Sequence, residues 1–266
     1  LQSAAWGAVS GALRGDAGDS VGAMFVDAGD EPVEAVLVLA PAGTTTRLGN
    51  LPALAVRASH ERVPLEGGAV AGVIRFNYWF PVIAAELDRA VDALRDVDGI
   101  VIDLRGNPGG VGFMAPGFAG HFLERGDTLG TMTTRQGKLH FAANPRRVDT
   151  QARPVRPFAG PVAILTDALT ASTSEIFAGG LQKLGRARVF GETSAGQALP
   201  AYARRLPDGD VMMHAVADLT GPGGERFEGA GVTPDVVAPP TREALLAGGD
   251  PALDAALHWI REVRSR

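Results

Sequence analysis

The chain has 266 residues, of which 45% are hydrophobic and 21% charged, a globular composition with room for one large domain or a medium and a small one. Its net charge of −5 argues against a nucleic-acid partner, and the lack of cysteine excludes disulfides, thiol catalysis and zinc–thiolate sites. No apolar run approaches the ~18 residues that a membrane-spanning helix needs. The chain begins at Leu1 without a signal-like segment, as a mature protein or a fragment of a longer one would.

The first part of the chain is predicted to hold little regular structure. We expect a weak helix over residues 1–13, short strands over 21–26 and 33–39, and a loop over 40–51, which is rich in Gly and Thr. This is too little apolar sequence for a core. The region is therefore predicted to be the end of a small module.

From residue 70 onward, short apolar strands alternate with helical patterns. Strands are expected at 70–76, 99–104, 161–165 and 187–190, helices at 83–94, 112–123, directly after Ser172, and at 251–263, and a hairpin at 128–142. Strands that alternate with helices imply right-handed crossovers and a largely parallel sheet. The predicted fold class is therefore α/β, with a mixed, largely parallel sheet and crossover helices.

Ser172 stands where an apolar strand gives way to a helix with apolar positions at Ile176, Phe177, Leu181 and Leu184. The free N–H groups and the dipole of a helix N-terminus stabilise developing negative charge, which suits a nucleophilic serine. The run from Ser172 to Glu175 also fits a capping box, in which the serine hydroxyl bonds to the backbone instead. Both interpretations are open from this segment alone.

Three further segments contain glycine-rich turns. Asp103-Leu-Arg-Gly-Asn-Pro-Gly-Gly110 follows a buried strand, and its glycines leave backbone N–H groups open, although the spacing is not that of a phosphate loop. Gly191-Glu-Thr-Ser-Ala-Gly196 misses the G-x-S-x-G elbow because Glu192 occupies the first glycine position. Glu228-Gly-Ala-Gly-Val-Thr-Pro-Asp235 is a glycine-rich turn before a strand.

In this order, the four segments resemble the C-terminal processing (tail-specific) serine peptidases, a family that includes the core of the tricorn protease. The resemblance covers roughly residues 70 to 240 and implies a ClpP/crotonase-like core. The stretch Leu13–Gly22 is similar to the end of the PDZ-like module that these peptidases carry. The resemblance therefore implies the C-terminal part of a PDZ-like module over residues 1–58 and a peptidase core over 59–266.

The resemblance also assigns roles to residues. It makes Ser172 the nucleophile and the amides of Gly110 and Thr173 the oxyanion hole, while Asp103 and Arg105 become scaffold. It implies a polypeptide substrate cut near its C-terminal tail, with no cofactor and no metal. It is compatible with an oligomer, and it implies export to the periplasm or the cell surface.

The chain departs from the family at the general base. Most bacterial members carry a lysine 25 residues after the nucleophile, where this chain has Gln197. An amide cannot take the serine proton near neutral pH, and Lys138 and Lys183 lie elsewhere in the pattern.

Three accounts of this departure are open. The chain resembles the tricorn-like branch, in which a Ser–His pair from an N-terminal helical segment acts with a glutamate that matches Glu228. Alternatively, Gln197 replaces the lysine to trap substrate, or the chain is a pseudoenzyme that binds tails without cutting them. The pair Ser59-His60 lies after the PDZ-like piece, where the family's pair does not. An enoyl-hydratase-like enzyme on the related fold is a further alternative.

Overall fold

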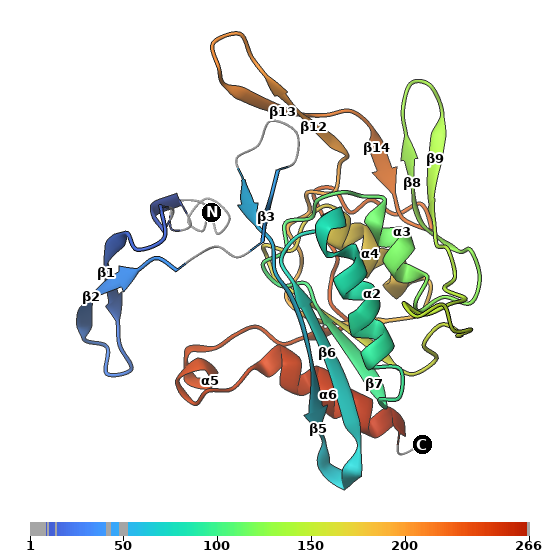
Figure 1. Cartoon of the computed structure of the whole chain (residues 1–266), viewed down its shortest axis with the longest axis horizontal. Helices are drawn as coiled ribbons and strands as arrows, with labels where there is room; N and C mark the ends of the chain where they lie inside the picture. Colours follow the sequence, from blue (N-terminus) through green and yellow to red (C-terminus); the bar gives the residue numbers. More distant parts are fainter. Residues whose placement is uncertain (1–8, 10, 14, 41–43, 48–52, 265–266) are drawn as a thin grey trace.

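A six-stranded sheet forms the centre of the computed structural model, which describes residues 9, 11–13, 15–40, 44–47 and 53–264 (Figure 1). In spatial order its strands are β15 (Val236–Val237), β11 (Arg188–Gly191), β10 (Val162–Thr166), β7 (Gly99–Asp103), β6 (Val70–Phe76) and β5 (Ala58–Pro64). The strands from β15 to β6 are parallel, and β5 is antiparallel to β6. The predicted mixed, largely parallel sheet is confirmed.

Helices cover both faces of this sheet (Figure 1). One face packs against α2 (Ala84–Ala93), α3 (Met114–Ala119) and α4 (Thr173–Lys183), and the other against α6 (Pro251–Arg264). Strand β7 shows why: Ile100 and Ile102 point into the first core, and Val101 into the second. A strand buried on both faces is apolar along nearly its whole length, and this apolar run is the pattern from which the strand was predicted.

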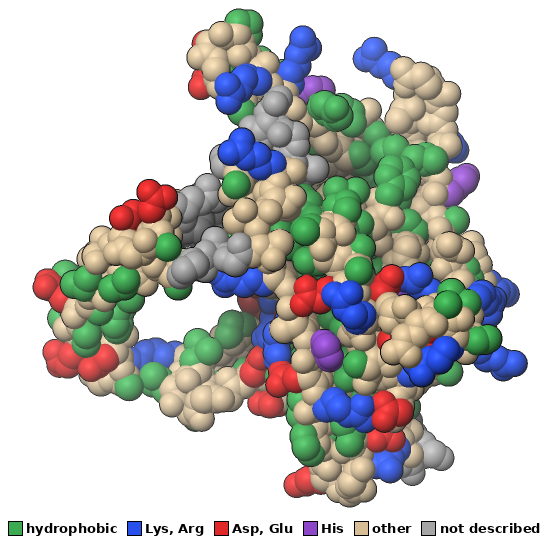
Figure 2. Space-filling model, in the orientation of Figure 1, with side chains coloured by type: hydrophobic (Ala, Val, Ile, Leu, Met, Phe, Trp, Pro, Cys, Tyr) green, Lys and Arg blue, Asp and Glu red, His purple; other side chains and the backbone are tan. Residues whose placement is uncertain are grey.

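The remaining strands form small sheets around the core. They are the β1 (Ser20–Val26) and β2 (Pro32–Val38) hairpin, the short pair β3 (Thr45–Thr46) and β4 (Leu54–Ala55), the three strands β8 (Thr128–Thr133), β9 (Lys138–Ala142) and β14 (Asp218–Thr220), and the β12 (Ala201–Arg205) and β13 (Val211–Ala215) hairpin. Short helices are α5 (Arg242–Leu246) and the 3₁₀ turns Glu66–Gly68 and Pro81–Ile83. Figure 2 shows hydrophobic side chains on the surface of the β1–β2 hairpin, which stands apart from the central sheet.

Strand β5 was not expected from the sequence. Ser59 and His60 both belong to this strand, where His60 pairs with Ile74 of β6. The strand is an edge with mostly exposed polar side chains, so it lacks the apolar run that marks the buried strands.

Other boundaries also differ from expectation. The helix expected over 112–123 is confined to Met114–Ala119, and a Cβ at Gly120 would overlap the backbone carbonyl of Asn144. Most of the helix expected over 1–13 lies outside the described residues. Within this range, the described residues 9, 11 and 12 are helical. Among the described helices, none combines the length and apolar character that crossing a bilayer requires.

Candidate active site

Ser172 joins strand β10 to helix α4 in an unusual backbone conformation, with φ 55° and ψ −117°. A positive φ in a residue other than glycine costs about 1–3 kcal/mol and persists only where the surroundings enforce it. Here the Ser172 N–H donates to the Gln197 carbonyl oxygen at 3.0 Å and to the Glu175 carboxylate at 2.9 Å. The Ser172 carbonyl oxygen accepts the Ile176 N–H at 3.0 Å. Hydrogen bonds at both the N–H and the carbonyl oxygen of Ser172 therefore hold the turn in place.

The capping box predicted at this helix is present. In one half of it the Ser172 N–H donates to the Glu175 carboxylate at 2.9 Å. The Glu175 N–H donates to the backbone carbonyl oxygen of Ser172 at 2.9 Å, and the Ser172 hydroxyl makes no hydrogen bond of normal geometry that caps the helix. Both interpretations of Ser172 therefore stay open, because its side chain lies in the capping position while the Glu175 N–H bonds to the Ser172 carbonyl oxygen.

Glu175 has a larger part than the sequence indicated. Its side chain is fully buried, and it also accepts hydrogen bonds from the Ser194 hydroxyl at 2.6 Å, the Gly196 N–H at 2.7 Å and the Gln197 N–H at 3.0 Å. Burial raises the pKa of Glu175, and these donors act against the rise. One carboxylate therefore joins the Ser172 turn to the loop that carries Gln197.

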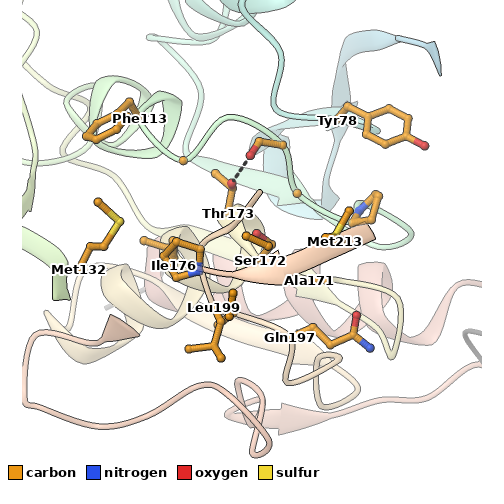
Figure 3. Close-up of a pocket in the computed structure, with 18 of the residues that line it drawn as sticks. Tyr78, Phe113, Met132, Ala171, Ser172, Thr173, Ile176, Gln197, Leu199 and Met213 are labelled. Atoms are coloured by element: carbon orange, nitrogen blue, oxygen red, sulfur yellow. Dashed lines mark hydrogen bonds between the residues drawn. The ribbon is translucent and has the colours of Figure 1, made fainter. Parts of the chain in front are cut away.

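The glycine loop after β7 lies directly against the Ser172 turn. Gly109 has φ 98°, and a Cβ there would lie 2.7 Å from the Cβ of Ser172 and 3.0 Å from the Thr173 nitrogen. Gly110 has φ 147°, and a Cβ there would overlap the Trp79 carbonyl oxygen. Only glycine fits either position. The Thr173 hydroxyl donates to the Gly110 carbonyl oxygen at 3.1 Å (Figure 3).

Two backbone donors beside Ser172 are unused. Among the described residues, neither the Gly110 N–H nor the Thr173 N–H has a hydrogen-bond acceptor. Their neighbours are satisfied, since the Gly109 N–H donates to Asn107 Oδ1 at 2.9 Å and the Val111 N–H to the Trp79 carbonyl at 2.7 Å. Gly110 is half-buried, and Thr173 begins α4, whose first N–H groups have no acceptor within the helix, so both donors are available to a ligand in this place.

A cavity of about 610 Å³ brings the expected site residues together. Its lining includes all five of them: Ser172, Thr173, Gly110, Gln197 and Glu228. Ser172 lies near the middle of the view in Figure 3, with Thr173 above it and Gln197 to one side. Ser172 and Glu228 are 56 positions apart in the sequence, and they share this cavity.

The described residues that line the cavity include no lysine and no histidine. Gln197, at the position of the family's lysine, is exposed. Glu228, expected to orient a hydroxyl or an imidazole, lines this cavity, and its Oε2 accepts the N–H groups of Ala198 at 2.8 Å and Leu199 at 3.0 Å. It therefore holds the chain that follows Gln197.

The other polar groups singled out in the sequence lie away from this cavity. Arg105 donates to Asp103 at 2.7 Å and to Asp250 at 2.7 Å, which ties β7 to the start of α6. Burial disfavours the charged guanidinium, yet these bonds raise the pKa of Arg105. His60 is exposed on β5 outside the cavity. The described residues bring no three His, Cys, Asp or Glu side chains together as a metal site.

Comparisons with known proteins bear on the chain as a whole. Residues 71–238 match the model of peptidase family S41. A carboxyl-terminal-processing protease of Picosynechococcus sp. is 30% identical over 188 residues, which cover 70% of this chain and 43% of that protein. A probable CtpA-like serine protease of Staphylococcus epidermidis is 27% identical over 167 residues, 62% of this chain and 33% of that protein. The chain thus spans less than half the length of these relatives.

Solved structures show a similar fold. A photosystem II D1 C-terminal processing protease matches with a TM-score of 0.56 and 24% identity, over 90% of this chain and 62% of that one. A protein from Bacteroides fragilis that is named a putative S41 protease matches with a TM-score of 0.66 and 17% identity, over 92% of this chain and 66% of that one. At these identities the likeness is one of fold.

The strain at Ser172 gives a stability test. Replacing Ser172 with glycine removes the cost of a positive φ, whereas alanine keeps it. We expect Ser172→Gly to exceed Ser172→Ala in free energy of unfolding by about 1 kcal/mol, after glycine's greater loss of chain entropy is subtracted. Urea denaturation of the two variants measures this difference. Equal stabilities would contradict a strained turn.

Proposed function

Because the chain belongs to peptidase family S41, we propose that it is a serine peptidase that hydrolyses peptide bonds in polypeptides near their C-terminal tails. The observation that carries the proposal is the pair of unused N–H groups of Gly110 and Thr173 beside Ser172. Such donors stabilise the negative charge that develops on a carbonyl oxygen during attack.

The proposed reaction runs through a covalent intermediate. The Ser172 hydroxyl oxygen attacks the peptide carbonyl carbon while its proton passes to a base, and the carbonyl oxygen becomes an anion held by Gly110 and Thr173. The carbon–nitrogen bond then breaks, the amine leaves with a proton, and water hydrolyses the acyl ester on Ser172. Each oxyanion donor is worth about 10²–10³ in rate in comparable enzymes.

The identity of the base separates three proposals. We favour a base supplied from outside this sequence, as in the tricorn-like branch, with Glu228 fixing the chain at Ala198 and Leu199 beside it. A second proposal makes Gln197 a replacement that traps substrate. A third is a pseudoenzyme that binds polypeptide without cutting, and the exposed amide of Gln197 in the cavity is the observation that supports it.

The rest of the domain assignment is also a proposal. The β1–β2 hairpin stands apart from the central sheet, which supports residues 1–58 as part of a PDZ-like module and 59–266 as the peptidase core. The family resemblance alone implies export to the periplasm or cell surface, and it is compatible with an oligomer.

A fluorophosphonate probe tests the nucleophile directly. We expect it to attach to Ser172 in the native chain and to no residue of Ser172→Ala, because Ser172 lies beside both free donors. Mass spectrometry of the digested protein locates the adduct. Attachment to another serine, or equal labelling of the alanine variant, would refute the assignment.

Substitution at Gln197 distinguishes the proposals for the base. We expect slow or no cleavage of an unstructured tail peptide by the native chain, since loss of a general base costs about 10²–10⁴ in rate. Gln197→Lys should raise cleavage only if the remaining site is built for a lysine. Gln197→Met, with a similar length and no charge, is the control, and fast cleavage by the native chain would contradict a missing base.

Glu228 is tested through the same probe. Its Oε2 accepts two backbone N–H groups, and an amide accepts them more weakly than a carboxylate. We expect Glu228→Gln to slow labelling of Ser172 by about tenfold, while Glu243→Gln on the exposed face of α5 leaves the rate unchanged. An unchanged rate in Glu228→Gln would remove Glu228 from the site's function.

A further inference from the structure

Trp79 lies beside the glycine loop but is not part of the cavity wall. Its side chain is fully buried, and it is absent from the described residues that line the Ser172 cavity. Its neighbours Tyr78 and Phe80 both line the cavity, and their rings stack with centroids 5.3 Å apart. Any effect of Trp79 on a ligand bound at Ser172 therefore has to pass through other residues.

The backbone of Trp79 brackets Gly110 in a parallel β-bridge. The Trp79 N–H donates to the Gly109 carbonyl oxygen at 3.0 Å, and the Trp79 carbonyl oxygen accepts the Val111 N–H at 2.7 Å. In a planar trans peptide group the C=O and the N–H point in opposite directions. Because the Gly109 carbonyl points to Trp79, the Gly110 N–H of the same peptide group points away from Trp79.

The side of the glycine loop that faces away from Trp79 faces the Ser172 turn. The Gly110 carbonyl oxygen, which the bridge does not use, accepts the Thr173 hydroxyl at 3.1 Å, and this bond is the dashed line in Figure 3. A Cβ on Gly109 would lie 2.7 Å from the Cβ of Ser172. The bridge to Trp79 therefore turns the unpaired Gly110 N–H toward Ser172.

The indole of Trp79 connects this bridge to helix α4. Its Nε1–H donates to Ser174 Oγ at 2.9 Å, and the Ser174 hydroxyl donates to the Asn107 carbonyl oxygen at 3.2 Å. The indole also packs against the Phe177 ring of α4, with centroids 5.2 Å apart. These contacts hold the Trp79 backbone in a fixed position relative to the start of α4, where the Thr173 N–H is the second unpaired donor.

We propose that Trp79 is a positioning residue of this site, which sets the orientation of the Gly110 N–H through its backbone bridge. Its indole bond to Ser174 keeps that bridge aligned with α4. Without the bridge, the peptide group between Gly109 and Gly110 is free to rotate, because glycine carries no side chain that restricts it. This inference rests on the proposed function, in which the Gly110 N–H stabilises the oxyanion.

Labelling kinetics separate this role from a loss of stability. Trp79→Phe keeps an aromatic ring and removes the indole N–H. We expect its limiting rate of Ser172 labelling by a fluorophosphonate to fall about tenfold, which is part of the about 10²–10³ that loss of a whole oxyanion donor costs. The probe concentration that gives half of this limiting rate should change by less than about twofold, because Trp79 does not line the cavity.

Two further variants complete this test. Ser174→Ala removes the acceptor of the indole N–H and leaves every ring in place, so its limiting rate should fall as well. Phe122→Leu is the matched control, because Phe122 is a buried ring of the same core that contacts Phe118 and Phe177 rather than Trp79. It should lower the Tm without slowing labelling, and thermal unfolding verifies that each variant is folded at the assay temperature. An unchanged limiting rate in folded Trp79→Phe or Ser174→Ala, or equal slowing in Phe122→Leu, overturns the proposal.

Amide hydrogen exchange tests the same bridge without any need for catalysis. The N–H groups of residue 79 and Val111 are its two donors, and NMR measures their exchange rates. We expect both rates to rise at least about tenfold in Trp79→Phe, because an opened bridge exposes both donors, and to stay unchanged in Phe122→Leu. Faster exchange without any labelling of the native chain supports the positioning role and refutes the nucleophile. Labelling of the native chain with unchanged exchange in Trp79→Phe refutes the positioning role alone.

Discussion

The contact between the Ser172 turn and the glycine loop is the constraint on which the site depends. Ser172 can adopt its positive φ because the Gln197 carbonyl and the Glu175 carboxylate hold its N–H, and because Gly109 presents no side chain to it. The same arrangement leaves the Gly110 and Thr173 donors unpaired. Strain in one residue and two unsatisfied donors are costs to stability, and such costs concentrate where a protein binds or reacts.

Asn107 connects the two sides of this contact. Its carbonyl oxygen accepts the Ala171 N–H at 3.0 Å and the Ser174 hydroxyl at 3.2 Å, while its Oδ1 accepts the Gly109 N–H at 2.9 Å. Its Nδ2 donates to the Phe76 carbonyl oxygen at 2.9 Å, which anchors the loop to the end of β6. The side chain is fully buried. The donors are therefore positioned before any ligand arrives, which is how a preorganised site lowers a barrier.

The sequence analysis predicted correctly those elements whose residues show a local hydrophobic pattern. The buried parallel strands are continuous apolar runs, and β6 has the expected bounds Val70–Phe76. Strand β5 has no such run because it is an exposed edge, so the sequence analysis did not predict it. The PDZ-like assignment of the N-terminal region stays a prediction, because a two-stranded hairpin is compatible with many modules.

The order of the motifs was enough to predict a shared site for Ser172, Gly110, Gln197 and Glu228, and the four residues line one cavity. Their roles stay proposals. It could not show that Glu175 links two loops, because buried hydrogen bonds depend on tertiary positions that spacing does not encode. Nor could it show that the Glu175 N–H bonds to the backbone carbonyl oxygen of Ser172 within this capping box.

The central claim is that the Gly110 and Thr173 N–H groups converge on an oxygen bound at Ser172. A crystal structure of the chain after reaction with a fluorophosphonate tests this most directly, because the phosphonyl oxygen occupies the place of the oxyanion. We predict that this oxygen accepts both N–H groups at about 2.7–3.1 Å. A phosphonyl oxygen turned toward solvent, with both donors still unpaired, would contradict the account.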